Sequence, residues 1–159
     1  MNVDFSKLDL SKAKGKFRFI DSVDGKVIKV ADWYHNLIVA NTGNGFSAIL
    51  RQMAGESSAS LEFTKAQLGA GTTPPTLADT GLEDMDVDNI LLADVPELNA
   101  SSATFQFFAP SIDVPTGTYN EVGFFMGSAL WSRAIIDPAY EKSGSADTKI
   151  EYVLTFSNI

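Results

Sequence analysis

The sequence predicts a mainly β protein, an antiparallel β-sandwich of jelly-roll-like form with one short α-helix. Two patterns favour this fold: short apolar–polar alternations separated by turn residues, and a single stretch with helical periodicity. The chain has 159 residues, of which 45% are hydrophobic and 11% aromatic, so it can bury one core. We expect residues 15–159 to form this single domain and residues 1–14 to form an N-terminal arm.

The first two predicted strands form a hairpin. Phe17 and Phe19 alternate with basic residues, which is the two-residue period of a half-buried strand. Asp24-Gly25 predicts the turn, and residues 26–30 return as the second strand because they are rich in Val and Ile. Residues 33–39 continue as extended chain.

One helix is expected next. Its apolar residues recur at three- and four-residue spacing. Asn41 or Thr42 can cap its start, and Gly55 ends it. The apolar set is Phe46, Ile49, Leu50 and Met53.

The remaining segments are predicted to be β. The strands cover residues 61–68, 85–95, 104–108, 119–126, 130–136 and 149–157. The last strand has the clearest alternation, and we expect one set of its side chains to line the interior. That set is Ile150, Tyr152, Leu154 and Phe156.

A glycine- and proline-rich loop, residues 68–83, separates two of these strands. Gly69 and Gly71 permit positive φ, and the following Thr-Thr-Pro-Pro run favours an extended path with few backbone donors. Asp79 is expected to cap a turn. The loop holds no nucleophile–base pair, so we interpret it as a contact surface; the alternative is a passive connection between strands.

The charge distribution is uneven. The net charge is −8, but residues 1–30 hold seven Lys/Arg against four Asp/Glu, whereas residues 31–159 hold five against sixteen. This acidic body argues against nucleic-acid binding. The chain has no apolar segment long enough to cross a bilayer, and without cysteine it has neither a disulfide framework nor a thiolate metal site.

Residues with catalytic potential are few. His35 is the one histidine, it follows the aromatic residues Trp33 and Tyr34, and no nucleophile elbow accompanies it. We therefore expect a structural or interfacial His35, no enzymatic activity and no cofactor.

An acidic run is the sharpest site-like pattern. Asp84, Asp86 and Asp88 alternate along extended chain, an arrangement that suits a hard cation such as calcium. The run lacks the glycine and the final glutamate of an EF-hand, so it is only a weak candidate cation site. An acidic strand edge that discourages pairing with other chains explains it equally well.

Contact surfaces are expected around exposed aromatic residues, the loop and the arm. Large rings beside loops are hard to bury fully and favour an interface or a carbohydrate-binding surface. The basic arm can lie on a neighbouring acidic subunit. The expected interface residues are Phe5, Leu8, Trp33, Tyr34, His35, Thr72, Thr73, Pro74, Pro75 and Trp131.

Four blocks in fixed order resemble a family of tailed-bacteriophage virion structural proteins, over about residues 33–157. The family is associated with tail, collar, fibre and baseplate components, and some relatives decorate heads. The resemblance implies a small β-rich module used in many copies. The blocks are His35-Asn36-Leu37-Ile38, the helix that follows, the loop of residues 68–83, and the run from Glu121 through Arg133 to Phe156.

The resemblance and the residues together predict a non-enzymatic virion structural protein, most simply a tail, fibre or baseplate attachment component. A capsid decoration (cement) protein is the alternative within this class, and a carbohydrate-binding module is the alternative outside it. We expect a homo-oligomer, made in the cytoplasm of a host bacterium and located in the virion. Its expected partners are other virion proteins (tail, portal or capsid subunits), with no nucleic acid and no membrane.

Overall fold

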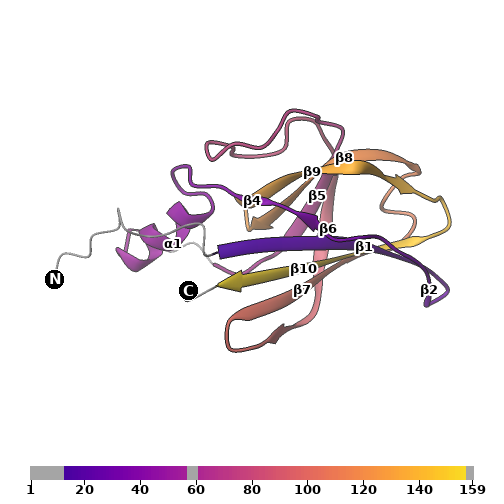
Figure 1. The fold of residues 1–159 in the computed structure, drawn as a ribbon, viewed down its shortest axis with the longest axis horizontal. Helices are drawn as coiled ribbons and strands as arrows, with labels where there is room; N and C mark the ends of the chain where they lie inside the picture. Colours follow the sequence, from indigo (N-terminus) through magenta and orange to yellow (C-terminus); the bar gives the residue numbers. More distant parts are fainter. Residues whose placement is uncertain (1–12, 57–60, 157–159) are drawn as a thin grey trace.

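A computed structural model describes residues 13–56 and 61–156. Within these ranges the chain forms ten strands and one helix, which confirms the mainly β, antiparallel prediction with a single short helix (Figure 1). The elements are β1 (Ala13–Val23), β2 (Lys26–Val30), β3 (Tyr34–His35), β4 (Leu37–Ile38), α1 (Phe46–Met53), β5 (Lys65–Gly69), β6 (Met85–Leu98), β7 (Ser102–Ala109), β8 (Gly117–Met126), β9 (Ala129–Lys142) and β10 (Asp147–Phe156).

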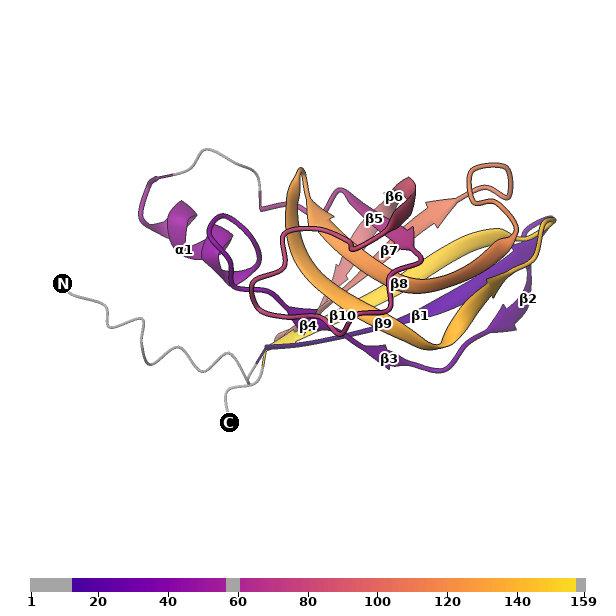
Figure 2. The same cartoon turned by 90° about the horizontal axis from the view of Figure 1, so that it is seen from above.

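The strands belong to one continuous sheet in the order β2-β1-β10-β7-β6-β5-β8-β9-β4. The sheet curls, so that β1 and β10 face β8 and β9 across the core (Figures 1 and 2). The short strands β3 and β4 join the two sides: His35 pairs with Lys16 of β1, and Leu37 pairs with Arg133 of β9. The two layers of the sandwich are therefore two halves of one sheet.

Aromatic rings fill the space between the layers. Phe17 and Phe19 are 0% and 1% exposed, as their alternation predicts. Phe124 stacks on Tyr152 at 4.4 Å between ring centroids, and Phe19 stacks on Tyr140 at 4.0 Å. Stacked and edge-to-face rings of this kind add stability beyond their buried area.

The closing strand has the predicted phase, with one correction. Ile150, Tyr152 and Leu154 are buried, but Phe156 is 45% exposed. Phe156 pairs with Ala13 at the last register position of β1 and β10. The described sheet ends there, and the ring lies at its edge rather than in its interior.

A second correction concerns the start of α1. The residue at the N-cap is Gly45, with φ 53° and no side-chain capping bond. Neither Asn41 nor Thr42 is at the cap position, and Asn41 Oδ1 accepts from the backbone N–H of Thr42 at 2.6 Å instead of from the helix. Gly45 is needed because a Cβ there would lie 1.9 Å from the Val39 carbonyl oxygen. The predicted end is confirmed, since Gly55 follows the helix with φ 72°.

The N-terminal hairpin is confirmed, and its turn residues Asp24 and Gly25 both have positive φ. β2 is nevertheless exposed along its whole length. β1 begins at Ala13, so residues 13 and 14 belong to the sheet rather than to the arm. Phe5 and Leu8 lie outside the described residues.

Candidate functional site: an anchored loop and an apolar pocket

The loop between β5 and β6 is held by one buried carboxylate, that of Glu121 on β8, which is 0% exposed. Its Oε1 accepts hydrogen bonds from the backbone N–H groups of Gly71 (3.0 Å) and Asp84 (2.7 Å). Its Oε2 accepts one from the backbone N–H of Glu83 at 3.1 Å. Both ends of the loop are thus fixed to the same side chain.

Arg133 of β9 lies beside Glu121 and is 3% exposed. Its Nε donates to Glu121 Oε2 at 2.8 Å, and its two terminal nitrogens donate to Asp79 at 3.1 Å and Glu83 at 3.4 Å. Charge-assisted bonds from a planar guanidinium fix geometry strongly. One buried cation therefore holds β8 and two points of the loop together.

Two further carboxylates close turns within the loop. Asp79 accepts from the N–H of Thr76 at 3.0 Å and from its hydroxyl at 2.9 Å, which confirms the predicted turn cap. Glu83 accepts in the same way from the N–H (2.8 Å) and hydroxyl (2.9 Å) of Thr73. The loop therefore has many fixed backbone positions without regular secondary structure.

These contacts set the charge state of the loop. Burial acts to raise the pKa of Asp79, but the hydrogen bonds from Thr76 and Arg133 outweigh it and the pKa is lowered. The hydrogen bonds from Thr73 are the main cause of the lowered pKa of Glu83. For Arg133, burial is outweighed by Glu121 and Asp79, so the pKa is raised. Asp79, Glu83 and Arg133 are therefore all charged at neutral pH.

Gly69 and Gly71 serve close packing rather than positive φ, which corrects the expectation from sequence. Neither has positive φ. A Cβ on Gly71 would lie 2.5 Å from Glu121 Oε1, and one on Gly69 would lie 2.3 Å from the Asp84 carbonyl oxygen. The two glycines let the loop backbone approach the buried carboxylate.

The outer side of the loop is the part available for contact. Thr72, Thr73 and Pro74 are exposed and Pro75 is half-buried. The loop lines an open hollow of about 440 Å³ with Arg133 in its wall. Glu121, Arg133 and the two loop carboxylates bond to one another and to the loop backbone. The outer side of the loop is therefore a fixed surface of threonine and proline.

Three other expected interface residues lie close together in the chain. Trp33, Tyr34 and His35 lie at or near β3, with His35 exposed and Trp33 and Tyr34 half-buried. Lys16 and Arg18 stand over the Trp33 ring at 4.4 and 4.5 Å from its centroid.

Trp131 is not on the surface, which corrects its assignment to an interface. It is 2% exposed, and its Nε1 donates to the Tyr152 hydroxyl at 3.0 Å. Asn36 also donates to that hydroxyl, at 3.2 Å. The indole therefore belongs to a buried polar contact that joins β9 to β10.

The acidic run is not gathered around one point. Among the described residues, no group of three or more His, Cys, Asp or Glu side chains is arranged to hold a metal ion, and this includes Asp84, Asp86 and Asp88. Asp88 instead accepts from Lys65 Nζ at 2.7 Å and Gln67 Nε2 at 2.9 Å. The hydrogen bond from Lys65 is the main cause of its lowered pKa.

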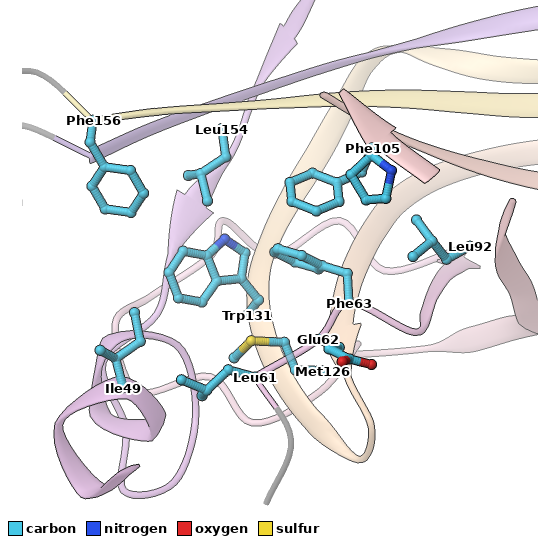
Figure 3. Close-up of a pocket in the computed structure, with 11 residues that line it drawn as sticks. Ile49, Leu61, Glu62, Phe63, Leu92, Phe105, Met126, Trp131, Leu154 and Phe156 are labelled. Atoms are coloured by element: carbon cyan, nitrogen blue, oxygen red, sulfur yellow. The ribbon is translucent and has the colours of Figure 1, made fainter. Parts of the chain in front are cut away.

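A second feature, an apolar pocket beside α1, was not predicted from the sequence. Its volume is about 570 Å³, and Figure 3 shows Trp131 in the middle of its wall. No local pattern could reveal it, because its lining comes from six separate parts of the chain. The labelled apolar lining residues are Ile49, Leu61, Phe63, Leu92, Phe105, Met126, Trp131, Leu154 and Phe156.

Comparison with protein-family models, curated proteins and solved structures found no match. In residues 13–56 and 61–156, no helix has the length and apolar character needed to cross a bilayer.

Proposed function

We propose that this chain is a non-enzymatic structural protein of a tailed-bacteriophage virion, which docks on other virion proteins through the outer side of the loop of residues 70–84. The observation that carries the proposal is the anchoring of this loop on the buried Glu121–Arg133 pair. A surface that is already ordered has little conformational entropy to lose on binding. Such a surface suits a component that must assemble in many copies.

The sequence blocks support the same proposal. Glu121, Arg133 and the glycines of the loop all lie in segments that resemble the phage family, and in this chain they are in contact. The pattern of residues that resembles the family is therefore also the pattern that orders the loop.

Within the virion, we favour the tail or fibre-attachment apparatus, with a capsid decoration protein as the alternative. Both need a stable small domain with a preformed contact surface. The carbohydrate-binding alternative has less support, because Trp131 is buried and the Trp33 ring carries Lys16 and Arg18 over it.

Locating the chain in purified particles tests the proposal. Mass spectrometry of gradient-purified virions and immunogold labelling should find it in particles, at the tail or baseplate. Labelling over the head surface would favour the decoration alternative. Absence from washed particles would contradict the virion role.

The docking surface needs a separate test. Pro74→Lys with Leu77→Lys changes the outer side of the loop, where Leu77 is 50% exposed, and leaves Glu121, Arg133, Asp79 and Glu83 in place. We expect a folded protein that is incorporated poorly into particles. Ile112→Lys is the matched control, since Ile112 is 87% exposed in another loop. Equal incorporation of both variants would remove the loop from the docking surface.

A further inference from the structure

The apolar pocket has exposed walls. Phe156 is 45% exposed and Leu61 is 38% exposed, although both line it together with buried Trp131 and Leu154. Clustered apolar surface of this kind marks a place where something binds. Its occupant can be inferred from the part of the chain that begins beside it.

The arm leaves the sheet at the rim of the pocket. Ala13, the first residue of β1, pairs with Phe156 of β10, and Phe156 is one of the pocket walls (Figure 3). Residues 1–12 therefore start from a point next to the pocket, and their attachment holds them at high effective concentration there.

The arm has the side chains that such a pocket accepts. Phe5, Leu8 and Leu10 are apolar residues in an otherwise mostly polar and charged segment. Extended chain covers about 3.3 Å per residue, so Leu8 can lie up to about 17 Å from Ala13 and Phe5 up to about 26 Å. These side chains can therefore reach the pocket even if the arm turns back on itself.

We propose that residues 1–12 dock in the apolar pocket of their own chain, with Phe5 and Leu8 as the anchoring side chains. Burial of these two side chains removes apolar surface from water on both sides of the contact. Lys7 and Lys12 of the arm are balanced by Asp4 and Asp9, so the contact depends on apolar burial rather than on charge. This inference does not depend on the virion role.

Introduced cysteines test the position of the arm directly, since the chain has none of its own. Ile49 of α1 lines the pocket together with Phe156, on the same side of the Trp131 ring (Figure 3). In the variant Leu8→Cys with Ile49→Cys, mild oxidation should form a disulfide within one chain, seen by mass spectrometry and by mobility on non-reducing gels. The control pairs Leu8→Cys with Val27→Cys, whose β2 lies far from α1 (Figures 1 and 2), and should stay reduced.

The other outcomes overturn the proposal. A disulfide-linked dimer from Leu8→Cys with Ile49→Cys would place the arm in the pocket of a neighbouring copy. Equal oxidation of the test and control pairs would mean that the arm has no preferred site.

A dye-binding experiment measures whether the arm covers the pocket. The full chain, the deletion of residues 2–12 and the variant Phe5→Ser with Leu8→Ser are compared for binding of 8-anilinonaphthalene-1-sulfonate. We expect the last two to bind the dye several-fold more strongly, and a synthetic peptide of residues 1–12 to displace it.

Two controls apply. A peptide carrying Phe5→Ser and Leu8→Ser should not displace the dye, and circular dichroism should show that Phe5→Ser with Leu8→Ser leaves the domain folded. Unchanged dye binding in that folded variant would overturn the proposal.

Discussion

The loop of residues 70–84 and the helix α1 differ in the contacts that fix them to the sheet. The loop has no regular secondary structure, yet Glu121 and Arg133 fix it through buried, charge-assisted hydrogen bonds. The helix α1 is regular, but its N-cap makes no side-chain bond, and among its residues only Phe46 is buried. Regular structure and a well-anchored backbone are therefore separate properties in this protein.

The difference follows from the forces used. Hydrogen bonds to a buried carboxylate are directional, so they set the loop's path atom by atom. Apolar contacts at the pocket depend on buried area and have no preferred direction. The first arrangement gives a defined surface for docking, and the second suits a contact that adapts to the side chains it receives.

Removing the buried charge of Arg133 should have the largest effect on the stability of the protein. Arg133→Met leaves the Glu121 carboxylate buried without a counter-charge, so we expect a loss of about 3–5 kcal/mol in the free energy of unfolding. Urea titration measures it. The control is Arg18→Met, which removes the partly exposed pair with Glu151 at 2.9 Å and should cost at most about 1 kcal/mol. Equal losses would mean that the buried cluster is not the anchor.

At the pocket end, stability should depend on how far each side chain is buried. Leu154 is 7% exposed and Phe156 is 45% exposed. In the chain that lacks residues 2–12, Leu154→Ala should cost about 2–5 kcal/mol, whereas Phe156→Ala should cost only about 1 kcal/mol because half of its ring is then in water. Denaturant titrations of the two variants make the comparison. A larger loss for Phe156→Ala would show that this ring is covered in the folded protein.

Glycine substitutions sharpen the account of the loop. Gly71→Ala would place a Cβ 2.5 Å from Glu121 Oε1, so we expect a loss of about 1–3 kcal/mol from overpacking against a fixed carboxylate. Gly81 is the matched control in the same loop, because a Cβ there meets nothing within 4 Å. Gly81→Ala should be neutral or slightly stabilising. Similar thermal midpoints for the two variants would contradict the close-approach role.

Acid should weaken the contacts of the loop of residues 70–84, with a smaller effect on stability than the substitutions above. Asp79 and Glu83 have lowered pKa values, so their contribution is complete above the ordinary carboxyl values of about 3.9 and 4.3. It is lost as the pH falls through the lower folded-state pKa values. Asp79→Asn with Glu83→Gln should flatten the fall in stability below about pH 4.3. An unchanged acid profile, followed by circular dichroism, would place the acid-sensitive groups elsewhere.

Local sequence patterns determined much of the fold. The alternation in residues 17–19 and 150–154 predicts which side chains enter the core, because successive residues of a strand point to opposite faces. Asp24-Gly25 predicts its hairpin because both turn positions have positive φ. The end of α1 at Gly55 has the same local origin.

The tertiary structure alone decided the positions that depend on distant neighbours. The N-cap of α1 is a glycine, Gly45, because the Val39 carbonyl oxygen leaves no room for a Cβ there. Phe156 is exposed because the described sheet ends at its pair with Ala13. Glu121 and Arg133 are twelve residues apart, and neither has a local pattern that marks it as the loop's anchor. Periodicity reports the direction of a side chain along its own strand, whereas burial and ion pairing depend on which strands the folded chain brings together.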